Sequence, residues 1–381
     1  MKSIVPRPQI SPRDIRFDIL KVIGLLCIIL AHSDPPIVID QLRNFDVPLM
    51  VIISGTLFYL TTGNKQFFLW DYLRKRVPRL VAPVWLFLAF FFTAIYLLCQ
   101  ATGQTYPYLS DASSNPILSS FLFRGGLGYV YIIRVFLITA ILSPLILKLY
   151  RSLKRESYFL GVLAISYIAY EIALKLLGDG GLSPPWFAIF VKQYLMLCVP
   201  YGCLVGLGMV LTRLSQQFLS TIVLASFTIF LAMFAHFFWL AKQLGKPAAE
   251  LVQTQIYKYP PTIYYLSYAI FASLLLYLVI DYCMKRYGSR VMEHKSWVDN
   301  LVFVSASSLW VYLWHIFWLI TWRLVVQPHI PLTQNFVMTF GVIAFLAIAT
   351  TYLQKWLVTQ LIRTTEIGHS QSDLLTILLL K

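Results

Sequence analysis

Lys21 and His32 are ionisable residues within one apolar stretch of the chain, eleven positions apart. In an α-helix, eleven residues make three turns and about 20°, so both side chains lie on one face, about 16 Å apart along the axis. Asp18, three residues before Lys21, lies near that face and can pair with Lys21. Histidine titrates near neutral pH, which makes His32 a candidate general base. The alternative is that Lys21 extends to the lipid headgroups and His32 simply lies at the membrane interface.

Five further ionisable residues stand in apolar stretches far apart in the sequence: Arg134, Glu171, Lys192, His236 and His315. With the topology derived below, all five lie in the same half of the membrane as His32. Such residues are costly in lipid, so a shared polar cavity explains them better than five separate placements. Each also has a simpler explanation, such as a local pair of Glu171 with Lys175 or the packing of His236 among aromatic residues.

A basic cluster, Arg74, Lys75, Arg76 and Arg79, lies in the loop before another apolar stretch. Guanidinium groups bind phosphates through paired hydrogen bonds, so the cluster is suited to a phosphate-rich donor such as a coenzyme A thioester. The alternative is a cluster that fixes the orientation of the chain and contacts anionic lipid.

The composition places these residues in a membrane protein. Of the 381 residues, 59% are apolar and 12% are charged, whereas about 25% of a soluble chain is charged. The apolar stretches reach the roughly 20 residues that a membrane-crossing helix needs, and they show no alternation of polar and apolar residues. We therefore predict an all-α fold, a polytopic transmembrane helical bundle of about ten spans. The spans are expected at residues 17–33, 47–62, 80–100, 128–149, 158–177, 187–211, 218–241, 263–283, 300–324 and 336–359.

The basic residues predict the orientation. They are denser in the segments at residues 13–16, 74–79, 151–155 and 285–295 than in the alternate loops, which places both termini in the cytoplasm by the positive-inside rule. This distribution accounts for the net charge of +15 without a nucleic-acid partner.

The spacing of the spans leaves no room for a soluble domain between them. We expect one membrane-embedded domain over residues 1–362 and a short cytoplasmic tail over residues 363–381. The five cysteines lie in or beside apolar spans with no metal-type spacing, so neither a disulfide framework nor a metal site is expected.

Four motifs, in order along the chain, resemble the acyltransferase 3 family of integral membrane O-acyltransferases. They are RFDILK at residues 16–21 followed by His32, FDVPLMVIISG at residues 45–55, RVPR at residues 76–79 followed by Pro83, and SSLWVYLWH at residues 307–315. Lys21 stands where the family usually has arginine, and Arg134 lies in a span where many members have Trp and Glu. In both departures the chain resembles the branch of the family that includes fucose 4-O-acetylase-like and exopolysaccharide acetyltransferases.

The resemblance implies an acetyl-CoA-dependent O-acyltransferase. Such an enzyme moves an acyl group, most often acetyl, from cytoplasmic acyl-CoA to a hydroxyl of an envelope glycan, an exopolysaccharide or a lipid-linked sugar. Acyl-CoA is then a substrate, and no permanently bound cofactor is expected. The implied location is a bacterial inner membrane, where the chain is multi-pass and in contact with lipid.

The resemblance also assigns roles to the candidate residues. His32 is the expected general base, and His315 faces the acceptor with it. Asp18 orients Lys21, which together with the basic cluster holds the donor. Arg134 is expected to stabilise an oxyanion or to orient a carboxylate of the acceptor.

Two other functions stay open at this stage. A transporter or flippase for a small solute or lipid-linked sugar would also line its pathway with intramembrane charges, although no inverted repeat of the kind that transporters often show is visible. A noncatalytic membrane component of polysaccharide assembly would make His32 replaceable.

Overall fold

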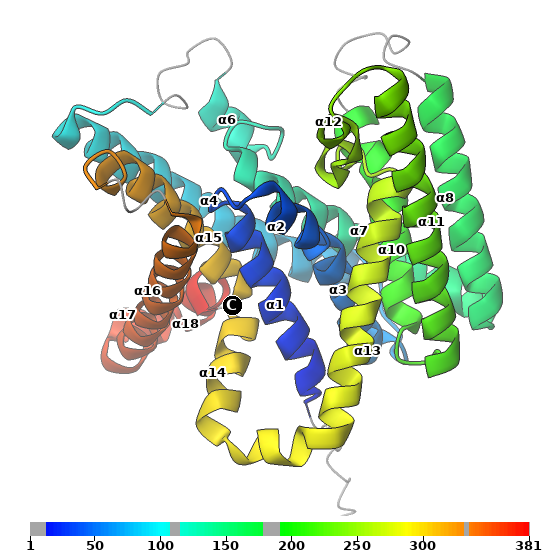
Figure 1. Ribbon diagram of the computed structural model, residues 1–381. Coiled ribbons are helices and arrows are strands. Elements are labelled where there is room, and N and C mark those ends of the chain that lie inside the picture. The colour runs from blue at the N-terminus through cyan, green and yellow to red at the C-terminus, as the bar shows by residue number, and fades with distance from the viewer. Residues whose placement is uncertain (1–12, 107–114, 178–190, 331–334, 381) are drawn as a thin grey trace, which may run out of the picture.

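The computed structural model describes residues 13–106, 115–177, 191–330 and 335–380. Helix follows helix through these ranges (Figure 1), and no strand occurs within them. A chain in lipid must satisfy its backbone hydrogen bonds internally, and apolar stretches of about 20 residues do so as helices. The prediction of an all-α polytopic bundle is confirmed.

Eight helical segments of the described chain are long and apolar enough to cross a membrane. They are α2 (Ile37–Leu42) continuing into α3 (Asp46–Thr62), α4 (Leu69–Thr102), η1 (Gly128–Val130) with α7 (Tyr131–Leu153), α8 (Glu156–Leu177), α11 (Gln216–Gln243), α13 (Ile263–Glu293), α15 (Ser308–Thr321) with η4 (Trp322–Val326), and α16 (Phe336–Thr364). Shorter helices are α6 (Pro116–Phe121), α12 (Ala248–Val252) and η3 (Thr254–Tyr257).

Two of the ten expected spans are shorter than the other eight. The stretch at residues 17–33 forms α1 (Ile15–Ala31), with 17 residues. The stretch at residues 187–211 contains α10 (Met196–Val210), with 15 residues, after a π-helical turn at Val191–Leu195. Eight of the ten predicted spans therefore have the required length, and the total of ten remains a prediction.

α1 runs through the middle of the bundle (Figure 1). It packs against α3, α13, α14 (Lys295–Ala306), α15 and α16, and its Leu20, Leu25 and Ile29 are almost fully buried. Such a helix is apolar on all sides because it faces protein on all sides. It carries Lys21 near its start, and His32 directly follows its last residue.

The start of α1 is fastened to α11 and α13 by charged groups. Arg16 pairs with Asp14 at 2.5 Å and with Asp281 of α13. Asp281 also accepts a hydrogen bond of 2.9 Å from Gln216 of α11 and pairs with Lys285 at 2.7 Å. Several partners on one carboxylate of α13 hold the starts of α1 and α11 against that helix in a fixed arrangement.

α3 and α10 lie in unusually close contact because glycines face the partner backbone. A Cβ added at Gly208 would lie 2.0 Å from the carbonyl oxygen of Ile52, and one added at Gly55 would lie 2.3 Å from that of Val205. Thr56 donates a hydrogen bond of 2.7 Å to the carbonyl of Gly208 across this interface. Small residues and such a polar contact are typical of tight helix pairs in membranes.

The predicted span at residues 300–324 is divided into two helices. α14 ends at Ala306 and α15 begins at Ser308, while Ser307 between them has φ −101° and ψ 11°. Carbonyl groups in the last turn of a helix have no helical partner. The break therefore leaves the carbonyl of Ser305 available to another group, which is Lys21 of α1.

The basic cluster lies on a helix, which corrects its expected place in a loop. α4 has 34 residues and is roughly 51 Å long, about 20 Å more than the hydrocarbon core. Its first turns carry Arg74, Lys75, Arg76 and Arg79, all exposed. The helix continues through Pro78 and Pro83, and because it is longer than the hydrocarbon core is thick, its first turns have room to lie outside that core.

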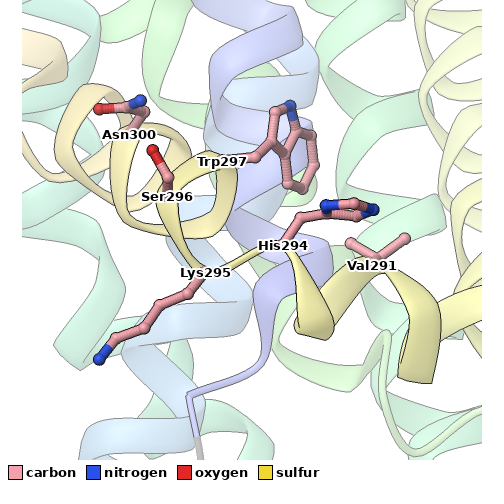
Figure 2. A pocket seen from close by; sticks show the side chains of 6 residues that line it. All are labelled: Val291, His294, Lys295, Ser296, Trp297 and Asn300. Carbon is pink, nitrogen blue, oxygen red and sulfur yellow. The ribbon is translucent and has the colours of Figure 1, made fainter.

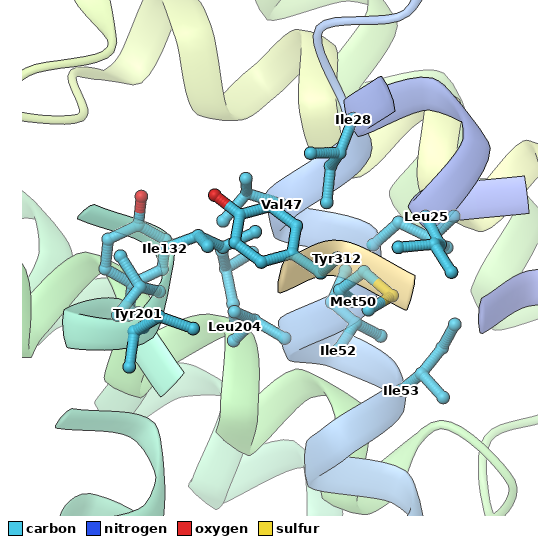
Figure 3. Packing of buried hydrophobic residues seen from close by; sticks show 14 of the residues in the cluster. Leu25, Ile28, Val47, Met50, Ile52, Ile53, Ile132, Tyr201, Leu204 and Tyr312 are labelled. Carbon is cyan, nitrogen blue, oxygen red and sulfur yellow. The ribbon is translucent and has the colours of Figure 1, made fainter. Parts of the chain in front are cut away.

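Apolar side chains fill the space between α1, α3 and α10. Figure 3 shows Leu25, Met50 and Leu204 in this cluster, and all three are buried. The hydroxyl groups of Tyr201 and Tyr312 point to the same side of it. The apolar core is thus bordered by polar groups on one side.

The C-terminal residues fold back onto the bundle. α17 (Glu366–Ser370) and α18 (Ser372–Leu375) lead into η6 (Thr376–Leu380), which packs against α4 and α16. Gln354 of α16 donates a hydrogen bond of 2.8 Å to the carbonyl of Leu379. The tail expected after residue 362 is therefore packed against the membrane domain over its described part.

The substitution Gly208→Ala should destabilise the protein by about 1–3 kcal/mol, because the new methyl group would overlap the backbone of α3. The matched control is Gly161→Ala, since a Cβ there meets no atom within 4 Å. Thermal unfolding in detergent, followed by size-exclusion chromatography, should show a lower midpoint for the first variant alone. Equal midpoints would contradict the close contact of α3 and α10.

Candidate active site

His32 and His315 come together although 283 positions separate them. Nδ1 of His32 is 2.9 Å from Nε2 of His315, and the two ring planes differ by only 6°. This geometry lets one ring donate a hydrogen bond to the other within the plane of both rings. The side chain of His315 is 0% exposed. Water therefore cannot reach Nε2 of His315 and replace this hydrogen bond.

The backbone determines which nitrogen of each ring carries a hydrogen. Nδ1 of His315 is hydrogen-bonded to the carbonyl oxygen of Tyr312, which can only accept, so this Nδ1 is the donor. In a neutral imidazole the other nitrogen accepts, so Nε2 of His315 receives its hydrogen bond from Nδ1 of His32. His32 is left with an unprotonated Nε2, whose lone pair can take a proton.

Groups from three other segments hold His32 in place. The rings of His32 and Tyr129 are packed edge to face, with their centroids 4.7 Å apart and their planes at 84°. Arg323 of η4 donates hydrogen bonds to the carbonyl of His32 at 3.0 Å and to Asp34 at 2.6 Å. Tyr312 donates to the carbonyl of Tyr129. The imidazole therefore has little freedom to turn, as a general base requires.

A cavity of about 140 Å³ adjoins the histidine pair. Its lining includes His32, the tyrosines Tyr129, Tyr131, Tyr259 and Tyr312, and the polar residues Arg43, Asp46, Gln255 and Lys258. This is about the volume that five water molecules occupy in liquid water. The cavity offers hydrogen-bonding groups of both kinds beside a candidate base.

A buried charge network forms one wall of this cavity. Asp46 accepts a hydrogen bond of 2.8 Å from Arg43 and lies 3.6 Å from Nζ of Lys258. Lys258 also donates to Asn44 at 3.1 Å. Arg43, Asn44, Asp46 and Lys258 are all buried, and charges in such a place are retained only when they are paired.

This network has only a weak signal in the amino-acid sequence. Arg43 and Lys258 had the appearance of loop charges, and Asp46 stood at the start of a motif without an assigned role. Lys258 lies more than 200 positions along the chain from its partner Asn44, and sequence spacing does not reveal such a contact.

Lys21 and Asp18 lie at the other end of α1. Lys21 donates a hydrogen bond of 2.7 Å to the carbonyl of Ser305. Asp18 accepts two hydrogen bonds from Arg13, at 2.8 and 2.6 Å, and one of 2.6 Å from the Ser305 hydroxyl. The direct pair of Asp18 with Lys21 is thus replaced by a contact of both residues with Ser305, which sequence reasoning missed.

The basic cluster lies near this end of α1. Arg76 is close enough for its charge to act on Lys21. Arg76 and Arg79 are three positions apart on α4 and therefore share a face of the helix. The structure thus places Arg76 near Lys21, and Arg74, Lys75 and Arg79 lie on the same turns of α4 as Arg76.

Arg134 lies outside the cavity lining described above. Its guanidinium group is over the rings of Tyr131, at 4.9 Å, and Tyr194, at 5.5 Å. Tyr131 itself lines the cavity. Arg134 thus contacts the site through an aromatic ring.

The expected gathering of six ionisable groups in one cavity is only partly found. His236 is exposed on α11 beside Trp239, so it faces the surroundings of the bundle. Glu171 accepts hydrogen bonds from Tyr167, at 2.7 Å, and from the backbone of Ile263; these contacts differ from both the shared cavity and the alternative of a local pair with Lys175. The side chain of Lys192 lies outside the described residues.

A larger hollow of about 760 Å³ lies at the turn between α13 and α14 (Figure 2). Val291, His294, Lys295, Ser296, Trp297 and Asn300 line it. It opens to the surface, and the 21 positions from His294 to His315 correspond to roughly 30 Å along the two helices. This hollow is therefore separate from the histidine site.

Comparisons with known proteins bear on the family of the chain. No curated protein and no solved structure matches the chain. A family model described as an acyltransferase domain matches residues 14–354, a range that contains both histidines, Lys21 and the basic cluster. The chain belongs to the acyltransferase 3 family of membrane proteins.

Proposed function

We propose that the chain transfers an acetyl group from acyl-CoA, bound from the cytoplasmic side, to a hydroxyl of an envelope glycan, an exopolysaccharide or a lipid-linked sugar. The observation that carries the proposal is the hydrogen-bonded pair of His32 and His315 beside a polar cavity, in a member of an acyltransferase family. The oriented imidazole is the group that acyl transfer to a hydroxyl needs, because an unaided hydroxyl is a poor nucleophile at neutral pH.

The reaction begins with His32 as general base. Its Nε2 takes the proton of the acceptor hydroxyl while the hydroxyl oxygen attacks the thioester carbonyl, which gives a tetrahedral intermediate. The bond from carbon to sulfur then breaks, and the departing thiolate receives the proton from the His32 imidazolium. The products are the acetyl ester and free coenzyme A, and His32 returns to its first state.

His315 acts as the positioning residue for this base. It receives the Nδ1 hydrogen of His32 and is itself fixed by the carbonyl of Tyr312. A neutral acceptor at Nδ1 favours the tautomer that keeps Nε2 of His32 free, and it stabilises the imidazolium that forms. The role corresponds to that of the carboxylate in a catalytic triad.

The donor is held from the other end of α1. Lys21, Arg76 and Arg79, with Arg74 and Lys75, offer positive charge for the phosphates of coenzyme A. Lys21 and His32 are about 16 Å apart along the helix axis, so the acyl end of an extended donor would approach the histidine pair while its nucleotide stays at the basic cluster. Arg134, placed over Tyr131, orients this ring beside the acceptor.

The proposal includes the orientation in the membrane. Both termini and the basic cluster face the cytoplasm, and the cavity beside His32 faces the opposite side of a bacterial inner membrane. The excess of Lys and Arg at the end that holds Arg76 supports this orientation.

Deletion of the gene in its host, followed by restoration with the native chain or with His32→Ala at equal abundance, tests the function. We expect O-acetyl groups on the surface glycans, measured by NMR and mass spectrometry, to vanish on deletion and to return with the native chain alone. Loss of a general base lowers the rate by about 10²- to 10⁴-fold. A change in glycan amount with unchanged acetylation per sugar would instead favour a transporter or flippase.

The two substitutions His315→Gln and His315→Leu should differ in activity. The glutamine carbonyl can accept the hydrogen bond from Nδ1 of His32, whereas leucine cannot. In acetyl transfer assays with equal amounts of protein, we expect the leucine variant to lose about 10²-fold and the glutamine variant to keep a clearly larger share. Equal losses would show that the hydrogen bond to His32 is not what matters.

The double substitution of Arg76 and Arg79 by glutamine should raise the KM for acetyl-CoA by about tenfold or more, with little change in kcat, because phosphate contacts are lost in the ground state and the transition state alike. Arg363→Gln is the matched control, since Arg363 is exposed at the end of α16, outside the cluster. An unchanged KM in the double variant would assign the cluster to orientation in the membrane.

A further inference from the structure

The segment at residues 253–259, between α12 and α13, is firmly attached to α2 and to the turn between α2 and α3. Gln41 accepts hydrogen bonds of 2.8 Å from both the backbone and the hydroxyl of Thr254. Asn44 donates to the same hydroxyl at 2.9 Å and accepts from Lys258 at 3.1 Å. Thr254 and Lys258 are 2% and 3% exposed, so both ends of the segment are anchored in the interior.

This anchored segment contributes to the cavity beside His32. Gln255, Lys258 and Tyr259 are among the lining residues. The Tyr259 ring meets the Tyr131 ring nearly at right angles, 4.6 Å between centroids. The segment is thus a rigid wall whose position relative to His32 is fixed through α3 and α7.

Gln255 has a property that its neighbours in the wall do not share. Its Oε1 atom is buried and has no hydrogen-bond partner within the described chain. A buried acceptor without a partner costs free energy, and such an atom in a cavity lining is suited to a ligand hydroxyl. Lys258, in contrast, is already bonded to Asn44 and lies near Asp46.

The remaining lining indicates the chemical class of the ligand. Tyrosine rings offer flat faces for the C–H groups of a sugar, and amide, carboxylate and cationic groups offer donors and acceptors for its hydroxyls. The volume of about 140 Å³ equals that of about five waters, which is enough for the reacting edge of one sugar ring.

We propose that the cavity wall formed by Gln255, Lys258 and Tyr259 selects the acceptor, and that Gln255 accepts a hydrogen bond from a hydroxyl of the sugar whose neighbouring hydroxyl is acetylated. This inference rests on the proposed function and adds the specificity-determining residue to it. The chemical requirement is a polyhydroxylated ring that presents at least two hydroxyls, one to Nε2 of His32 and one to Oε1 of Gln255.

The test uses the full chain in its host, with the gene deleted and restored at low, equal abundance. Gln255→Leu removes the acceptor atom, and Gln255→Glu keeps one. Gln253→Leu is the matched control, because Gln253 lies in the same segment but is not part of the cavity lining. Acetyl groups per sugar repeat are measured by NMR, and the unfolding midpoint of each purified variant is recorded.

We expect Gln255→Leu to lower acetylation about ten- to hundredfold, Gln255→Glu to keep a clearly larger share, and Gln253→Leu to equal the native chain. Should Gln255→Leu fail to fold, Gln255→Met, unbranched and of similar length, takes its place with the same expectation.

Two outcomes would overturn the proposal in distinguishable ways. If deletion removes the acetyl groups and Gln255→Leu restores them fully, or if Gln253→Leu is equally impaired, the selection by Gln255 is wrong while acyl transfer stands. If deletion leaves acetylation unchanged, the proposed function fails and this inference fails with it.

Discussion

The hydrogen bond between His32 and His315 is the interaction on which the rest of the account depends. It forms because α1 and the pair α14 and α15 run side by side in the same direction, joined at one end by Lys21 and Ser305 and at the other by the histidines. The break at Ser307 supplies the free carbonyl for the first contact. The packing of α1 against α14 and α15 thereby fixes the positions of both Lys21 and His32, about 16 Å apart along the axis of α1.

The fold and part of the site could be predicted from the sequence. Apolar stretches of about 20 residues indicate helices in a membrane because lipid leaves the backbone no other partner. Helical spacing placed Lys21 and His32 on one face, and the motif ending in His315 suggested a second histidine at the same depth. The acyltransferase 3 family, which the four motifs resemble, is shown by the match over residues 14–354. The roles of these residues remain predictions.

The rest depends on contacts that no local pattern encodes. The wall formed by Asn44, Asp46 and Lys258 joins loops more than 200 positions apart, and each residue by itself resembles an ordinary loop residue. The pair expected between Asp18 and Lys21 was wrong because Arg13 and Ser305 offered Asp18 closer partners. His236 was misplaced because depth along a helix says nothing about which side of the helix faces protein.

The most direct measurement is ¹⁵N NMR of the purified protein in lipid, with labelled histidine and with His32 and His315 assigned by substitution. We predict that at pH 7 both rings are neutral and carry their hydrogen on Nδ1, so that Nε2 of His32 is unprotonated. Free imidazole side chains favour the other tautomer, which makes the signature specific. A hydrogen on Nε2 of His32, or a charged ring at either position, would contradict the central claim.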